Sequence, residues 1–224
     1  MKKSLFTTIS LAFFGLIFTG CATFRSGLEM RYEGEKKRNV DGGRTSVLFV
    51  FSHVKQTVGF DAIPKLMTKH EIPRGFDDIF LDALREFSNV DKYATFTNDA
   101  ADVNKPERRS VKDSLMTAHD YTVKIRMVDE KYFTRLFLGT LASTMTATLA
   151  PVPYKEYFGL EVEVFDHDRK LIATYQRKAH LTKWVQTFMI FAYPFHPEER
   201  KREEVYMEFL HDAFRQMESE GILK

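Results

Sequence analysis

The sequence contains a single cysteine, Cys21, among 224 residues. Disulfide bridges and zinc sites with several thiolates need more than one cysteine, so the fold has to be stabilised by its apolar core alone. The seven histidines show neither the HExxH nor the HxxxH spacing of helical metal sites. The chain also has no GxSxG motif and no glycine-rich phosphate loop. We therefore expect no cofactor and no metal.

Acid and base residues that could act together in catalysis are also scarce. The nearest approach to a base with a carboxylate is His119-Asp120 and His167-Asp168. Adjacent residues point to opposite faces of a strand, so such pairs rarely serve one site. We expect the protein not to be an enzyme. Catalysis stays a third hypothesis, because a site assembled from distant residues leaves no local motif.

An excess of charge of one sign is absent as well. Lys2 and Lys3 are the only charged residues among the first 20, and the whole chain has 33 basic and 31 acidic residues. A chain that lost this segment would have a formal charge of zero. Such a chain has no general electrostatic attraction to nucleic acid, and we expect no nucleic-acid partner.

The amino terminus has the three-part pattern of an export signal. Lys2 and Lys3 precede a largely apolar run from Leu5 to Phe18, and small residues then lead to Cys21. The sequence Phe18-Thr19-Gly20-Cys21 resembles the lipobox of bacterial lipoproteins, although Phe18 stands where leucine is usual. The resemblance implies that residues 1–20 are a signal peptide and that Cys21 is diacylated and then acylated at its new amino group. An ordinary secretory signal with an incidental cysteine is the alternative.

The resemblance to bacterial lipoproteins also bears on location. Ala22 follows the cysteine where an aspartate would, by resemblance to enterobacterial lipoproteins, signal retention in the inner membrane. We therefore expect lipid anchoring at the outer membrane, facing the periplasm. Residues 21–45 are rich in charge and poor in apolar residues, which predicts a lipidated flexible tether. Residues 46–224 would then form one globular periplasmic domain.

The first half of this domain has the pattern strand, helix, strand. The run Val47–Phe51 lacks polar alternation and predicts a strand that is covered on both faces. Pro73 opens a predicted helix, Tyr93–Thr97 is a short strand, and Val111–Ala118 is a short helix after a loop that contains Pro106. The apolar positions of the Pro73 helix are Phe76, Ile79, Phe80, Ala83, Leu84 and Phe87.

The second half predicts three strands and a final helix. Residues 121–127 alternate between apolar and polar side chains, and residues 158–164 and 171–181 do so on either side of a turn at 166–169. In this hairpin we expect Val164 opposite Leu171 and Leu160 opposite Tyr175. Pro197 begins the last helix and Gly221 ends it. Its predicted buried stripe is Val205, Phe209, Leu210, Ala213, Phe214 and Met217.

Together these elements predict an α/β (α+β) fold with a single two-layer domain. It would contain a mixed sheet with a long C-terminal hairpin, flanking helices and a C-terminal helix. This order, with a short helix leading into His119-Asp120-Tyr121, resembles outer-membrane lipoprotein activators of penicillin-binding proteins and the periplasmic domain of the curli-secretion lipoprotein. The resemblance is architectural and implies no functional residue beyond Cys21.

Two apolar segments flank the hairpin and are not explained by this pattern. Residues 136–150 contain no charge but are too short to span a bilayer, and residues 184–195 are similarly apolar. An antiparallel hairpin brings its open ends together, so both segments should converge opposite the Asp166 turn. They either pack as ordinary core or form an exposed surface that faces a membrane or a partner. The candidate interaction residues are Leu136, Phe137, Leu141, Met145, Trp184, Phe188, Ile190 and Tyr193.

Two functions remain open at this point. One is a non-catalytic cell-envelope lipoprotein, a membrane-anchored adaptor or accessory subunit with an envelope protein partner. The other is a carrier that binds a lipid or another apolar ligand. A closed cavity lined by Phe137, Leu141, Met145, Phe188 and Ile190 would favour the carrier, and an open patch would favour the adaptor.

Overall fold

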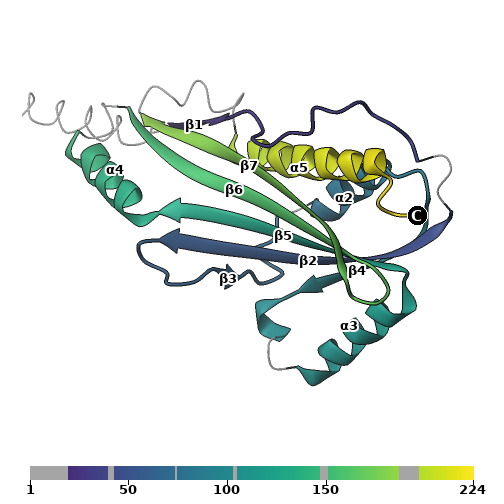
Figure 1. Cartoon of the computed structure of the whole chain (residues 1–224). Coiled ribbons are helices and arrows are strands. Elements are labelled where there is room, and N and C mark those ends of the chain that lie inside the picture. Colours follow the sequence, from purple (N-terminus) through teal and green to yellow (C-terminus); the bar gives the residue numbers. More distant parts are fainter. Residues whose placement is uncertain (1–19, 40–42, 74, 103–104, 147–150, 187–196) are drawn as a thin grey trace, which may run out of the picture.

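The computed structural model describes residues 20–39, 43–73, 75–102, 105–146, 151–186 and 197–224. Its centre is one mixed sheet with the strand order β1-β7-β6-β5-β2-β3, in which β4 also pairs with β2 (Figure 1). The strands are β1 (Gly20–Arg25), β2 (Thr45–Val58), β3 (Lys65–Leu66), β4 (Val90–Asn98), β5 (Tyr121–Tyr132), β6 (Val152–Phe165) and β7 (Leu171–Gln186). The helices are α2 (Phe76–Leu84), the 3-10 turn η1 (Ala100–Asp102), α3 (Pro106–Ala118), α4 (Phe133–Met145) and α5 (Glu198–Glu220). The predicted mixed α/β fold with a C-terminal hairpin and helix is confirmed.

Strand β2 lies in the middle of the sheet, as its apolar run predicted. It pairs in parallel with β4 on one side and with β5 on the other. Val47, Phe49 and Phe51 face the main core, whereas Leu48 and Val50 pack on the opposite face against Phe96 and helix α3. The continuous apolar sequence therefore reflects a strand with both faces covered.

Helix α5 closes the main core and has the predicted ends and buried stripe. Pro197 is the residue before its first turn, and Gly221 ends it in the left-handed conformation at φ 60°. Every residue of the predicted stripe has at most 1% of its surface exposed. The stripe packs on α2 and on the inward side chains of β5, β6 and β7.

Both earlier helices begin elsewhere than predicted. Helix α2 begins at Phe76, after Gly75 with φ 74°, and not at Pro73. Helix α3 is longer than the predicted Val111–Ala118 because Pro106 starts it. Proline lacks an N–H, and the first turn of a helix does not need one, so Pro106 opens a helix where we expected a loop.

The register of the hairpin also differs from the prediction. Val164 pairs with Ala173 and Val162 with Tyr175, with an irregularity between Val164 and Phe165. The turn causes the shift, because the Asp166 N–H donates to the Lys170 carbonyl at 3.1 Å and Arg169 adopts φ 61°. Leu171, expected on the inward face, is consequently 48% exposed.

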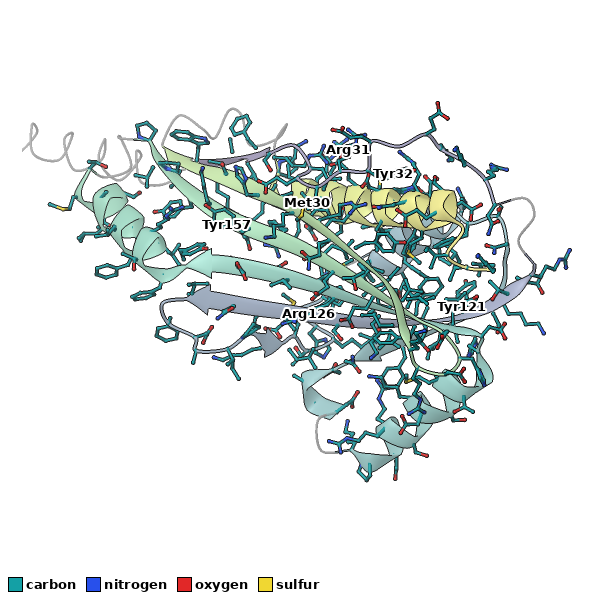
Figure 2. The ribbon with its side chains drawn as sticks, viewed as in Figure 1. Met30, Arg31, Tyr32, Tyr121, Arg126 and Tyr157 are labelled. Carbon is teal, nitrogen blue, oxygen red and sulfur yellow. The ribbon has the colours of Figure 1, made fainter. Side chains whose placement is uncertain are left out.

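Residues 20–39 lie along the domain, in contrast to the tether expected over residues 21–45. Strand β1 pairs with the outer edge of β7, and Ser26 and Glu29 continue this contact through their backbone N–H groups. Farther on, the Tyr32 N–H donates to Asp212 of α5 at 2.9 Å; Figure 2 shows Tyr32 beside this helix. The segment is held by backbone hydrogen bonds, which its polar composition does not reveal.

Candidate functional site

Helix α4 packs on the sheet through its smallest side chains. It follows β5 directly and contacts β6. A Cβ atom added at Gly139 would lie 2.8 Å from Cε1 of Tyr154 and 3.1 Å from Cγ1 of Val152. One turn later, Ser143 is 7% exposed and is the only buried residue of the helix. The glycine therefore allows the helix backbone to lie close to β6.

The large apolar side chains of α4 point away from the sheet. Phe137 and Leu138 are each 56% exposed, Leu141 is 48% exposed and Met145 is 80% exposed. At 3.6 residues per turn, these positions lie opposite Gly139 and Ser143. An ordinary surface helix buries its large apolar residues and exposes its polar ones. Helix α4 differs, because it exposes its large apolar residues and the one residue that it buries is Ser143.

The apolar surface continues onto the connection between β2 and β3. Phe60 of this connection is 73% exposed and stacks on Phe133, with ring centroids 5.6 Å apart. Phe133 in turn stacks on Phe137 at 6.0 Å. We call the residues Phe60, Phe133, Phe137, Leu138, Leu141 and Met145 the apolar end surface.

The apolar end surface lies at the end of the sheet where the lipidation candidate is found. Cys21 of β1 pairs with Val185 of β7, and Val185 pairs with Val152 of β6, which lies against Gly139 of α4. Neighbouring strands are about 4.8 Å apart, so the Cys21 backbone lies only about 10 Å from Val152. Figure 1 shows α4 at this end and the β6–β7 turn at the other.

The structure locates most of the predicted contact residues. Leu136 is 42% exposed on α4 with Phe137, Leu141 and Met145, and Trp184 lies half-buried on β7 opposite Pro153. The described parts of the two apolar segments thus meet at one end of the sheet. Phe188, Ile190 and Tyr193 lie outside the described residues.

The sequence analysis missed three residues of this surface, and one of them, Leu138, lies inside the uncharged run of residues 136–150. Phe60 and Phe133 stand outside the uncharged run that drew attention to residues 136–150. A signal for Phe133 was available, because Phe133, Phe137, Leu141 and Met145 follow one another at intervals of four residues. This spacing places them along one side of a helix. Phe60 is the one aromatic residue in the connection between β2 and β3 and carries no such pattern.

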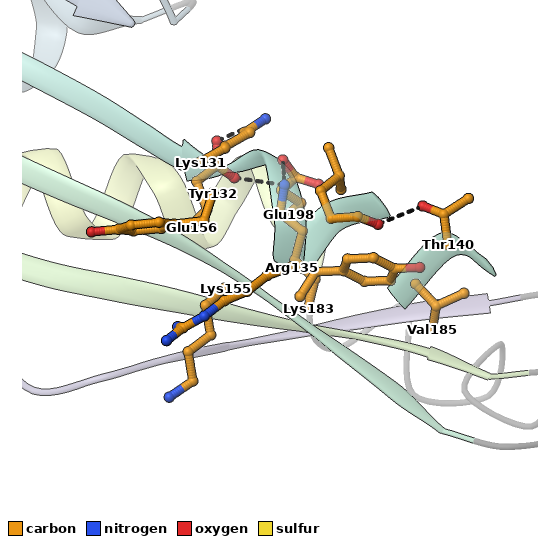
Figure 3. A pocket seen from close by; sticks show the side chains of 11 residues that line it. Lys131, Tyr132, Arg135, Thr140, Lys155, Glu156, Lys183, Val185 and Glu198 are labelled. Atoms are coloured by element: carbon orange, nitrogen blue, oxygen red, sulfur yellow. Dashed lines mark hydrogen bonds and ion pairs between the residues drawn. The ribbon is translucent and has the colours of Figure 1, made fainter. Parts of the chain in front are cut away.

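A pocket of about 280 Å³ lies beneath α4, between the helix and strands β6 and β7. Figure 3 shows the side chains that line it. Four of them are basic (Lys131, Arg135, Lys155 and Lys183) and two are acidic (Glu156 and Glu198). Leu136, Val185 and two tyrosines supply the apolar part of the lining.

Glu156 organises the charges at the base of this pocket. Its side chain is 4% exposed and forms ion pairs with Lys131 at 3.0 Å, Lys183 at 2.6 Å and Arg202 at 3.1 Å. Burial alone would raise the pKa of Glu156, but the charges of Lys183, Arg202 and Lys131 hold it below its usual value. Glu198 also pairs with Lys183 at 2.5 Å and with Arg202 at 3.0 Å, so the four basic residues of the lining face two carboxylates and the pocket has a positive balance.

A second buried carboxylate lies deeper, on β5. Asp129 accepts a hydrogen bond of 2.7 Å from the Tyr206 hydroxyl of α5. Burial raises the pKa of Asp129 to about 6, with the Tyr206 hydrogen bond and the Arg202 charge acting in the opposite direction. The Asp129 and Tyr206 side chains are enclosed between β5 and α5, so this pair belongs to the core of the domain.

The structure brings parts of the two histidine and aspartate pairs together, because the His167 ring lies 3.3 Å from the His119 carbonyl and His167 and Asp120 line one open pocket. Asp120 accepts hydrogen bonds from the Ser46 N–H at 2.8 Å and the Ser46 hydroxyl at 2.7 Å, while the His119 ring contacts the Leu115 carbonyl of its own helix. Asp120 therefore fixes the start of β2. Within the described residues no group of three or more histidine, cysteine, aspartate or glutamate side chains could hold a metal ion.

Comparisons with known proteins give structural matches of low similarity. No protein-family model and no curated protein sequence matches the chain. Two crystal forms of the PelC dodecamer from Paraburkholderia phytofirmans are similar at 10% identity and a TM-score of 0.33, covering 88% and 89% of this chain and 99% of the PelC chain. A TM-score this low supports no argument about function. Over the part of the chain that is described, no helix is long and apolar enough to cross a membrane.

Proposed function

We propose that this chain is a cell-envelope lipoprotein, anchored by acylated Cys21 and acting as a non-catalytic adaptor or accessory subunit. Its place would be the periplasmic face of the outer membrane, and its partner another envelope protein. The observation that carries the proposal is the apolar end surface, exposed at the end of the sheet where Cys21 enters β1. Large exposed apolar patches mark contact surfaces in folded domains.

The same observation favours the adaptor over the carrier. A closed cavity lined by Phe137, Leu141, Met145, Phe188 and Ile190 would have favoured the carrier. The first three of these side chains are between 48% and 80% exposed, and the other two lie outside the described residues. The pocket beneath α4 is lined instead by Leu136, Thr140 and several charged residues. Burying acyl chains next to these charges would be unfavourable, so the pocket is a poor site for a hydrocarbon ligand.

Substituting the lipidation residue tests the proposal. In cells given a radioactive fatty acid, the wild-type protein should incorporate label and sediment with the envelope. Cys21→Ser should remain unlabelled and unprocessed at this site, because serine cannot form the thioether to diacylglycerol. Val111→Ser, at a 50% exposed position of α3, is the matched control and should be labelled as the wild type is. Label retained by Cys21→Ser would refute the lipoprotein assignment.

A further inference from the structure

We infer that the apolar end surface is embedded in the interfacial region of the lipid bilayer, beside the acyl chains on Cys21. The inference rests on the lipidation proposed above and identifies the occupant of the apolar end surface as lipid. The end of the sheet where β1 begins and β7 ends would then lie at the membrane, and the β6–β7 turn would point away from it.

The first argument is the absence of a spacer between the lipid anchor and the folded sheet. Cys21 is already paired with Val185 as part of β1, and the next residue, Ala22, is fully buried. Acyl chains on Cys21 would therefore hold the end of the sheet itself at the bilayer surface. Because α4 lies against β6, only two strand spacings away, the helix is brought to the headgroup level along with Cys21.

The second argument is the chemistry of α4. Helices that lie in a membrane interface bury one apolar face about 5 to 10 Å into the boundary between headgroups and acyl chains. The outward side of α4 provides such a face in Phe133, Phe137, Leu141 and Met145. Arg135 is the only charged residue of the helix, and no acidic residue occurs between Phe133 and Ala150.

The third argument distinguishes a bilayer from a protein partner. Two threonine hydroxyls of α4 and that of Thr146, the residue after it, donate to carbonyls of the helix: Thr140 to Leu136 at 2.8 Å, Thr144 to Thr140 at 2.9 Å and Thr146 to Ala142 at 2.9 Å. These donors are therefore satisfied internally, which suits a helix in an apolar solvent. A protein interface normally surrounds its apolar centre with polar groups that bond across to the partner.

The fourth argument is the arrangement of basic and tyrosine side chains at the base of α4. Arg135 donates to the Tyr157 hydroxyl at 2.9 Å and lies 5.4 Å from the centroid of the Tyr132 ring. Lys155 is exposed at the same base. Arginine, lysine and tyrosine are the side chains that anchor proteins at the level of lipid headgroups. Their charge also complements anionic lipids.

Site-specific fluorescence quenching tests the inference on the lipidated protein. Cys21 is the only cysteine and its thiol would be occupied by lipid, so Met145→Cys or Leu141→Cys introduces a unique reactive thiol. Each variant is labelled with a small fluorophore and reconstituted in vesicles of phosphatidylcholine and phosphatidylglycerol. Val111→Cys, on the exposed side of α3 near the opposite end of the sheet, is the matched control.

We expect lipids brominated on their acyl chains to quench the labels at positions 141 and 145 several-fold more strongly than the label at 111. Iodide in the water should show the opposite order. Adding Phe137→Glu to the labelled Met145→Cys protein should abolish the quenching by brominated lipids. The protein should still float with the vesicles, because its acyl chains remain inserted.

The outcomes separate the inference from the proposed function. A purified protein that carries no acyl group and does not float with vesicles would refute the lipoprotein proposal, and the inference with it. A lipidated protein that floats, yet has labels at 141 and 145 as open to iodide as the label at 111, would refute the inference alone. The labels could also be protected from iodide in native envelopes but not in vesicles that contain no other protein. That result would overturn the inference and assign the apolar end surface to a protein partner.

Discussion

Helix α4 packs on the sheet through its small side chains. A glutamate should therefore destabilise the helix at a buried small residue and have little effect at its exposed apolar residues. Met145 is 80% exposed and Leu141 is 48% exposed, so Met145→Glu and Leu141→Glu place the new carboxylate in water. Substitutions at such positions usually change the free energy of unfolding by no more than about 0.5 kcal/mol. Ser143 lies between them in sequence and is 7% exposed, facing the sheet.

At Ser143 the same glutamate must displace the helix or bury its charge. Added volume in a packed contact costs about 1 to 3 kcal/mol, and an unpaired carboxylate adds to this. The cheapest response is for α4 to separate from β6, because the helix contacts little else in the described part of the chain. We therefore expect Ser143→Glu to weaken the docking of α4 by about 2 kcal/mol or more while the main core stays folded.

Hydrogen exchange of the amides in residues 133–146 measures this docking directly. In protein without acyl chains, studied in water without detergent, Ser143→Glu should speed their exchange by at least about tenfold, the factor that corresponds to 1.4 kcal/mol. Leu141→Glu and Met145→Glu should leave exchange close to that of the wild type. Equal acceleration by all three variants would show that the outer face of α4 is buried and would remove the basis of the contact surface.

Two further predictions concern the core. Phe80 is 3% exposed, and its ring centroid lies 5.0 Å from that of Phe49. Phe80→Ala should therefore lower the free energy of unfolding by about 3 to 5 kcal/mol. Asp78→Ala, at an exposed position of the same helix, should hardly change it. Urea unfolding checks this, and equal small effects would mean that α2 does not pack as described. Burial raises the pKa of Asp129 from an ordinary value of 3.8 to about 6. The folded state therefore binds this proton more tightly than the unfolded state does. The contribution of Asp129 to stability should fall as the pH rises from 4 to 7. The stability of the wild type relative to Asp129→Asn should drop by about 2 kcal/mol over that range, and a pH-independent difference would contradict the assignment.

Local sequence patterns predicted the elements whose stabilisation is local or strongly periodic. The ends of α5 follow from Pro197 and Gly221, and its stripe follows from regular apolar spacing. The alternation of β5 and the continuous apolar run of β2 likewise report how many faces each strand buries. In these elements, side-chain burial decides both the pattern and the structure.

Elements held by backbone geometry could not be predicted in the same way. Strand β1 is fixed by hydrogen bonds to the edge of β7, and nothing in its composition separates it from a tether. The hairpin register depends on an irregularity at Val164 and Phe165, which alternation of side chains does not specify.

The candidate site was only half predictable for a different reason. The uncharged run of residues 136–150 showed that α4 is unusual, but large apolar residues occur around much of the helix and hide which side packs. The informative residues are the small ones, Gly139 and Ser143, which lie one turn apart and mark the face against β6. Exposure of Phe137, Leu141 and Met145 follows from that choice of face.

The most direct test of the account is the intact mass of the protein purified from bacterial envelopes, combined with fragmentation of its amino terminus. The account predicts a chain that begins at Cys21 and carries a diacylglyceryl group on the thiol and a further acyl group on the amine. A chain that retains residues 1–20, or one with a free thiol at Cys21, would contradict it.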